Sequence, residues 1–232
     1  MKAKFIISVM LALFSYNASA QSCSGASIAL DHIIWAVPDL EVGVQDFRER
    51  TGIDPVYGGE HTNGVTANYL ASLGPCLYME IVGPKAGANL ADLGDRAGGY
   101  AEPNIAGFAF RYNLGETSET AMKVLGINLG PINEGGRIKP DGSALAWRTA
   151  GLVDLDLGPG KFQFVINWLS EPHPATTSPE GASLVTLTLA GDGVRTLKKI
   201  VEEERLPIVL QPAGRKGVWM MLNTPKGRVI FK

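Results

Sequence analysis

Hydrophobic and polar positions divide the chain from residue 28 onward into short apolar runs separated by Gly, Pro and Asp. Residues 28–37 (IALDHIIWAV) are rich in β-branched and aromatic side chains, which predicts a strand. Asp39 then precedes three apolar residues at helical spacing, Leu40, Val44 and Phe47. Because Asp is a favoured helix N-cap and Gly a favoured helix end, this spacing predicts a helix that stops at Gly52. Strand-like runs follow near residues 56–57, 66–73 and 77–82.

The same order of elements recurs twice. The second round has a strand at 105–112, a helix at 116–125 and strands at 137–138, 144–149 and 162–169. The third, shorter round has a strand at 183–189, a helix at 194–206 and strands at 207–210, 218–222 and 228–231. The pattern predicts an α+β fold of repeated βαβββ modules that share curved mixed sheets. We expect a first module at about 27–84, a second at about 104–169 and a shorter third unit at about 183–232. The Gly- and Pro-rich segments 85–103 and 170–182 are expected to be loops.

Composition excludes several classes of protein. The chain has 232 residues, of which 45% are hydrophobic and 19% charged, and its formal net charge is −2. This is too apolar for a disordered chain, and the basic excess of nucleic-acid-binding proteins is missing. No nucleophile elbow, P-loop, dinucleotide fingerprint or HExxH motif occurs. We therefore expect a globular domain whose partner is a small molecule and not a nucleic acid.

The N-terminus has the three features of a secretory signal peptide in order. Lys2 and Lys4 precede an apolar run at 5–14, which is too short to span a bilayer, and Ala18-Ser19-Ala20 provides a cleavage site. We expect residues 1–20 to be removed and the mature protein to be periplasmic or secreted, with no membrane attachment after cleavage. Export would permit a disulfide, and Cys23 and Cys76 are the two cysteines. They are either paired or two unrelated thiols.

Polar residues within apolar strand runs are the first candidates for chemistry. His32 and Glu80 each lie inside such a run, where an imidazole and a carboxylate from two strands would suit a divalent ion. The alternatives are a hydrogen-bonded core His and a Glu that faces water. His61 and Asn68 belong to a polar turn and the strand after it. They are interpreted either as an acid/base or metal ligand with a ligand-binding amide, or as residues that serve turn geometry alone.

Two further residues could contact a ligand. Arg137, near the Pro-Asp-Gly turn at 140–142, could hold an anionic substrate or be an exposed hairpin base. Trp168, at a strand end, could form an aromatic wall or serve plain packing.

A series of motifs gives the chain a family resemblance. In the first module they are LDHI at 30–33, VPDL at 37–40, Gly58-Gly59 followed by His61, TANYL at 66–70 and YMEI at 78–81. In the second they are Gly136-Arg137, LAWR at 145–148, FVINW at 164–168 and His173-Pro174. Taken together, the chain resembles the glyoxalase-like domain of the vicinal oxygen chelate superfamily.

The resemblance implies paired modules around a cup-shaped site, with His32 and Glu80 at the positions of two metal ligands. His61 would be a third ligand, or with Glu80 a catalytic group. The metal, if one binds, would be Zn, Ni, Fe or Mn, and it would act as a Lewis acid on vicinal oxygens. The second module departs from the pattern, because Gly107 stands at the first ligand position and residues 162–168 contain no acid, Asn167 being the nearest polar residue.

Two functions are carried forward. The first is a metal-assisted lyase, isomerase or oxygenase acting on a small oxygenated molecule. The second is a metal-independent protein that sequesters a small molecule in the same cup. In both, Trp35, Asn68, Arg137 and Trp168 would contact the ligand, and a homodimer is possible. The resemblance also implies that the first and fourth strands are parallel neighbours, and this predicts a Cys23–Cys76 disulfide at their common end.

Overall fold

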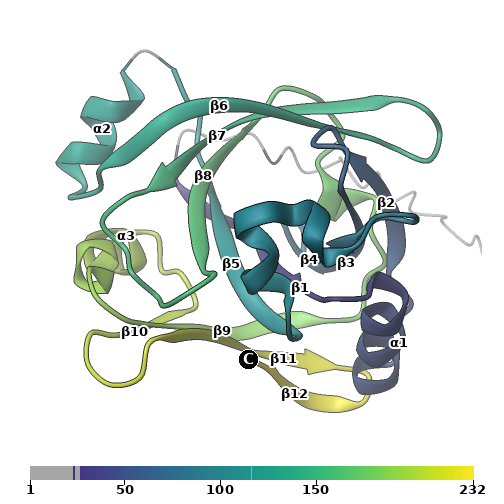
Figure 1. Ribbon diagram of the computed structural model, residues 1–232. Coiled ribbons are helices and arrows are strands. Elements are labelled where there is room, and N and C mark those ends of the chain that lie inside the picture. Colours follow the sequence, from purple (N-terminus) through teal and green to yellow (C-terminus); the bar gives the residue numbers. More distant parts are fainter. Residues whose placement is uncertain (1–22, 24–26, 116) are drawn as a thin grey trace, which may run out of the picture.

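A computed structural model describes residues 23, 27–115 and 117–232. The predicted signal peptide lies outside these residues. Eight strands form a closed barrel in the order β1-β4-β3-β2-β6-β7-β8-β5, and a separate four-stranded sheet has the order β10-β9-β11-β12 (Figure 1). None of the helices in the described part of the chain is long and apolar enough to cross a membrane.

The first module is β1 (Ala29–Ala36), α1 (Leu40–Thr51), β2 (Val56–His61), β3 (Thr66–Gly74) and β4 (Leu77–Pro84). As predicted, Asp39 caps α1 by accepting a hydrogen bond from the Val42 N–H, and Gly52 ends the helix with φ 77°. The crossover through α1 and the two hairpins that follow bring β4 beside β1 in parallel. His32 is therefore paired with Tyr78, and Ile34 with Glu80.

The second module repeats this arrangement with β5 (Asn104–Arg111), α2 (Ser118–Val124), β6 (Leu129–Ile138), β7 (Ala144–Leu152) and β8 (Phe162–Trp168). β5 and β8 are parallel, with Gly107 paired to Phe162 and Ala109 to Phe164. By register, Gly107 and Phe164 thus correspond to His32 and Glu80. The modules join where β1 pairs with β5 and β2 pairs with β6, both antiparallel, and these two seams close the barrel.

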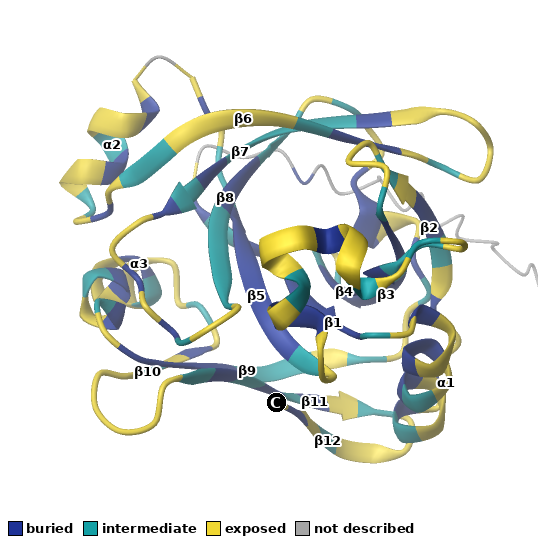
Figure 2. Cartoon of the chain, viewed as in Figure 1, coloured by how far each residue is buried: buried dark blue, intermediate teal, exposed yellow. Residues whose placement is uncertain are grey.

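The third unit is β9 (Ser183–Ala190), η3 (Val194–Leu197), α3 (Lys198–Glu203), β10 (Ile208–Gln211), β11 (Gly217–Thr224) and β12 (Gly227–Phe231). It packs against the outside of the barrel, and the main hydrophobic core fills the space between them (Figure 2). Trp35 of β1 meets Phe231 of β12 edge-to-face there, with ring centroids 5.0 Å apart. Burial of this apolar surface anchors the outer face of β1 and leaves its inner face for the site.

The segments expected to be loops contain helical turns. Residues 85–103 include η1 (Leu90–Tyr100), and residues 170–182 include η2 (Pro174–Thr176). Asn89 and Asp92 form a reciprocal capping box at the start of η1, and Gly94 at φ 56° allows the kink that divides it. Because of its glycines, this segment was expected to be irregular, whereas its capping side chains make it a short helical pair. The helix predicted over 194–206 is likewise divided into η3 and α3.

Cys23 and Cys76 form the predicted disulfide, with Cα atoms 5.5 Å apart and a sequence separation of 53. Replacing both by Ser should lower the free energy of unfolding by about 2–5 kcal/mol, because a long loop in the unfolded chain is released. Urea denaturation of the parent and the double variant measures this. The parent unfolded in the presence of a reducing agent should match the variant, and equal stabilities of oxidised parent and variant would contradict the prediction.

Candidate functional site

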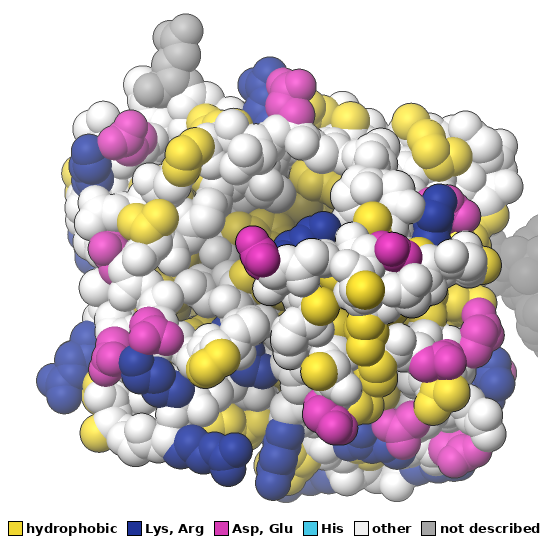
Figure 3. Space-filling view, viewed as in Figure 1, with side chains coloured by type: hydrophobic (Ala, Val, Ile, Leu, Met, Phe, Trp, Pro, Cys, Tyr) yellow, Lys and Arg dark blue, Asp and Glu magenta, His cyan; other side chains and the backbone are white. Residues whose placement is uncertain are grey.

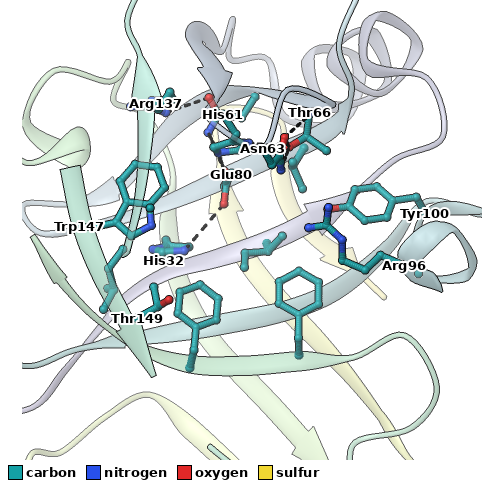
Figure 4. Close-up of a pocket in the computed structure, with 18 of the residues that line it drawn as sticks. His32, His61, Asn63, Thr66, Glu80, Arg96, Tyr100, Arg137, Trp147 and Thr149 are labelled. Carbon is teal, nitrogen blue, oxygen red and sulfur yellow. Dashed lines mark hydrogen bonds and ion pairs between the residues drawn. The ribbon is translucent and has the colours of Figure 1, made fainter. Parts of the chain in front are cut away.

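The barrel encloses a cavity of about 960 Å³, and part of its lining comes from η1. In Figure 1, the ribbon of η1 lies in front of the barrel strands. Figure 3 shows this hollow, with hydrophobic side chains inside and charged side chains at its edge. The lining has a polar part centred on His32, His61, Asn68, Glu80 and Arg137, of which all but Asn68 are labelled in Figure 4. Its apolar part includes Trp147, Phe162, Phe164, Ile166 and Trp168.

Glu80 is the centre of the polar part. Its side chain is buried, and its Oε1 accepts a hydrogen bond of 2.6 Å from Asn68 Nδ2. His61 Nε2 lies 3.3 Å from the same oxygen, and His32 Nε2 lies 3.8 Å from Oε2. Burial alone would raise the pKa of Glu80, but His61, His32 and Asn68 outweigh it and lower the pKa to about 2. Glu80 is therefore an anion at neutral pH.

Asn68 is held in one orientation by Arg137. The Arg137 Nη1 donates a 2.8 Å hydrogen bond to Asn68 Oδ1, so the amide nitrogen must face Glu80 and His61 Nε2, the latter at 3.3 Å. Gly58 makes this contact possible, because a Cβ at that position would collide with both Asn68 Oδ1 and Arg137 Nη1. Gly58 of the Gly58-Gly59 motif thus contributes to the site, because its missing side chain leaves room for the hydrogen bond between Arg137 and Asn68.

His32 is oriented by the neighbouring Asp31, which is fully buried. Asp31 Oδ1 lies 2.7 Å from His32 Nδ1, and the carboxylate also contacts His173 Nε2 at 2.9 Å, Trp168 Nε1 and Arg111. Burial alone would raise the pKa of Asp31, but hydrogen bonds from His173 and His32 hold it well below its usual range. An ionised Asp31 can only accept, so His32 donates from Nδ1 and turns Nε2 toward the cavity.

His61 is held in a similar way. Its Nδ1 lies 2.8 Å from Thr66 Oγ1, and its Nε2 lies 3.3 Å from both Asn68 Nδ2 and Glu80 Oε1. The Nε2 atoms of both histidines and the Glu80 oxygens therefore face the same region of the cavity. This is a set of donors that a divalent cation prefers.

The chemical types of these side chains suit a metal ion, but their positions do not form a complete metal site. Among residues 23, 27–115 and 117–232, no group of three or more His, Cys, Asp or Glu side chains is already placed so that it could hold a metal ion. The two imidazoles approach different oxygens of Glu80. The second module adds no ligand, because a side chain at Gly107 would collide with the Phe162 carbonyl and Phe164 occupies the other position.

The structure brings together most of the residues singled out from the sequence. His32, His61, Asn68, Glu80, Arg137 and Trp168 all line the cavity. Trp35 does not line it, so the prediction that Trp35 forms a wall of the cup is wrong. Side chains alternate along a strand, so Trp35 points to the opposite face from His32 and Ile34 and is buried in the core.

Several site residues were not singled out from the sequence. Asp31 lies at an irregularity in the β1–β5 pairing, which lets it and His32 both contribute to one network. Trp147 stands in the LAWR motif and lines the cavity beside Trp168, with ring centroids 5.4 Å apart. Arg96 and Tyr100 reach the mouth from η1, and burial raises the pKa of Tyr100 to about 12. A lone acid in an apolar run was the available signal for Asp31, whereas η1 gave none.

Comparisons with known proteins agree with this architecture. The family model described as a glyoxalase-like domain matches residues 30–204. The chain belongs to the glyoxalase-like domain family. Its fold is that of the vicinal oxygen chelate superfamily, which confirms the resemblance seen in the sequence. A search of curated proteins finds no match.

Several solved structures of distant proteins are similar to this chain. A hypothetical protein from Staphylococcus aureus has a TM-score of 0.58 and 16% identity, with 88% of this chain and 84% of that chain covered. Methylmalonyl-CoA epimerase from Mycobacterium tuberculosis has a TM-score of 0.41 and 16% identity, with 66% and 95% covered. A Streptomyces coelicolor methylmalonyl-CoA epimerase variant in complex with 2-nitronate-propionyl-CoA has a TM-score of 0.41 and 15% identity, with 63% and 100% covered.

The Asp31 network gives a prediction for this glyoxalase-like protein. Asp31→Asn removes the charge that His32, His173 and Arg111 face, so it should lower the free energy of unfolding at pH 7 by about 3 kcal/mol. Asp156→Asn is the matched control, because Asp156 pairs with Lys216 on the surface and should change stability by less than about 1 kcal/mol.

The same variant has a predicted dependence on pH. Because folding lowers the pKa of Asp31, its stabilising contribution is complete above about pH 4 and is lost as pH falls through the folded-state pKa. The difference between parent and Asp31→Asn should therefore shrink when urea denaturation is repeated at pH 3. A constant difference from pH 7 to pH 3 would show that the charge of Asp31 is not the cause.

Proposed function

We propose that this protein is an exported, metal-assisted enzyme of the lyase, isomerase or oxygenase type, and that its substrate is a small oxygenated molecule bound in the barrel. The observation that carries the proposal is the convergence of two imidazole nitrogens on one buried, ionised carboxylate. The surroundings of the two Glu80 oxygens show why a cation is proposed.

The two oxygens of Glu80 have different surroundings. Asn68 donates a hydrogen bond to Oε1, whereas the ring nitrogen that faces Oε2 is His32 Nε2 at 3.8 Å, too far for a direct hydrogen bond. A water molecule or a cation between these two atoms would join them. A divalent cation fits the donor types, because imidazole nitrogen and carboxylate oxygen are ordinary ligands of Zn²⁺ and related metals.

The residues then have separate roles. His32 and Glu80 would hold the cation, which would supply Lewis-acid polarisation of the substrate oxygens. Asp31 fixes the tautomer and direction of His32, in the way that carboxylates commonly support metal-bound histidines. Asn68 positions Glu80, and the aromatic side chains exclude water from the bound molecule.

Glu80 and His61 differ in the proton chemistry open to them. With its pKa at about 2, Glu80 stays ionised at neutral pH and is a weak base, so it suits the role of ligand better than that of acid. His61 has its Nδ1 held by Thr66 and its Nε2 toward the cavity. It is therefore the side chain best placed to take or give a proton on a bound substrate.

A second function, sequestration without a metal, is supported by the asymmetry of the barrel. The first module supplies both imidazoles and the buried carboxylate Glu80, while the second module lines the cavity with several aromatic rings and contributes the exposed Glu134. Such a cavity can retain an apolar molecule without chemistry.

Metal titration of the mature protein separates the two functions. After treatment with a chelator, the protein is titrated with Zn²⁺, Ni²⁺ and Mn²⁺ by calorimetry, and bound metal is quantified by elemental analysis. We expect one ion per chain with a Kd in the micromolar range or tighter. His32→Ala and Glu80→Gln should each weaken binding at least about tenfold, the scale expected for loss of one strong ligand contact.

Glu134→Gln is the control, because Glu134 is a carboxylate at the mouth of the same cavity that pairs with Arg148 and has 74% of its side chain exposed. Its binding should equal that of the parent. If the parent takes up none of these ions, or if Glu134→Gln weakens binding as much as Glu80→Gln, the metal-assisted function is wrong and sequestration is favoured.

A further inference from the structure

Arg137 is a buried cation without an anionic partner. Its side chain is 3% exposed, its Nη1 donates to Asn68 Oδ1, and its Nε is enclosed without any acceptor. No ion pair of Arg137 exists among the described residues, although the surface arginines Arg48 and Arg148 each have one. Burying a guanidinium without a counter-charge costs free energy, so the burial of Arg137 indicates a function that requires this side chain.

The backbone is arranged to make room for this guanidinium in the cavity. On β6, Arg137 pairs with His61 of β2 on one side and with Leu145 of β7 on the other. Gly58 lies beneath the contact between Arg137 and Asn68, where any side chain would collide with both. Figure 4 shows Arg137 on the same side of the cavity as His61 and Glu80. An acidic group bound by Arg137 would therefore lie next to the proposed metal site.

An aromatic wall, formed by Trp147, Trp168, Phe162 and Phe164, begins beside Gly135, which lies two residues before Arg137 on β6. Gly135 is paired with Trp147, and the absence of a side chain at Gly135 lets the Trp147 indole lie over the strand. Trp147 contacts Trp168 edge-to-face, while Phe162 and Phe164 stack with centroids 6.3 Å apart. This row of rings continues from the basic group into the 960 Å³ cavity. A flat apolar body would fit against it while an acidic end reaches Arg137.

The charges of the cavity floor favour the same ligand. This step rests on the proposed function: a divalent cation held by His32 and Glu80 would add positive charge beside Arg137, which has no ion pair among the described residues. At the mouth, Glu134 and Arg148 neutralise each other. A dry site with excess positive charge binds an anion more tightly than a neutral molecule of equal shape.

We infer that the ligand of this cup is a small organic acid with an aromatic-sized apolar body, whose anionic group is bound by Arg137 and whose body packs on Trp147, Trp168 and Phe164. This names the substrate class of the proposed site. It also gives Arg137 a role in ligand binding that is separate from its support of Asn68.

Matched probes test the inference by calorimetry. 2-Naphthylacetate and 2-naphthylacetamide have nearly the same shape but differ in charge, and acetate carries the charge without the ring system. With metal-loaded parent protein, the naphthyl acid should bind about 10- to 100-fold more tightly than the amide, as expected for a charged hydrogen bond in a dry site. Acetate should bind more weakly than the naphthyl acid by at least a similar factor, because it lacks the apolar area.

Variants assign the preference to one side chain. Arg137→Met should remove most of the preference for the acid while the amide binds within about threefold of the parent. Arg148→Met is the control, because Arg148 lies on the neighbouring strand, paired with Glu134 outside the polar cluster, and the preference should be retained. Arg137→Lys, which keeps the charge, should restore part of it. Melting temperature and metal content of each variant are measured in parallel.

The outcomes separate this inference from the proposed function. Equal binding of acid and amide by the parent, no binding of either, or a preference that survives in Arg137→Met would overturn the inference, and Arg137 would then serve only to orient Asn68. Protein that binds no metal yet shows an Arg137-dependent preference for the acid supports the inference and overturns the metal-assisted function. Protein that binds metal without the preference does the reverse.

Discussion

The parallel pairing of β1 with β4 is the constraint on which the site depends. It places His32 beside Tyr78 and Ile34 beside Glu80, so that an imidazole and a carboxylate 48 positions apart in the chain face one cavity. Parallel neighbours can be joined only through a crossover, and α1 supplies it. The disulfide then ties the residues before β1 to the start of β4 at the same end of the sheet. The register of this strand pair is thus supported by a helix, two hairpins and a covalent bond.

The two modules share one backbone arrangement but line the barrel interior with different side chains. In the second module, Gly107 and Phe164 stand at the positions of His32 and Glu80, and the strand contact at Gly107 leaves no space for a longer side chain. The barrel interior is consequently divided into a polar half and an aromatic half. That division favours a ligand with two unlike ends, because each end finds a matching surface only in one orientation.

Much of the fold was predictable because its signals are local. The Asp39 cap, the helical spacing after it and Gly52 define α1 within fourteen residues, and the strands follow from runs of β-branched and aromatic side chains. His32, His61 and Glu80 were singled out because polar groups in or beside apolar strands need partners, and the family motifs gave them a common site. Trp35 was misplaced because the alternation along β1 was not applied to it.

The rest depends on contacts between distant residues. The orientation of Asn68 is set by Arg137, 69 positions away, and nothing near either residue in the sequence reveals that contact. The helical turns of η1 were missed because four glycines or alanines within 97–101 gave no periodic signal, while Asn89 and Asp92 act through a capping box that is only visible in the structure. Local patterns therefore define the elements, whereas tertiary contacts define the chemistry.

The Asp31 network has a consequence for how the site in the cavity is assembled. Asp31 receives its partners from β1, β5, β8 and the residue that precedes η2, so the carboxylate is satisfied only when both modules have docked. A fragment containing the first module alone would carry His32, His61, Asn68 and Glu80, yet His32 would lack the surroundings that direct its ring. The first module supplies the imidazole and carboxylate groups, but the orientation of His32 depends on residues from both modules. Assembly of the two halves, late in folding because its contacts are distant in sequence, is thus the step at which the cup becomes competent.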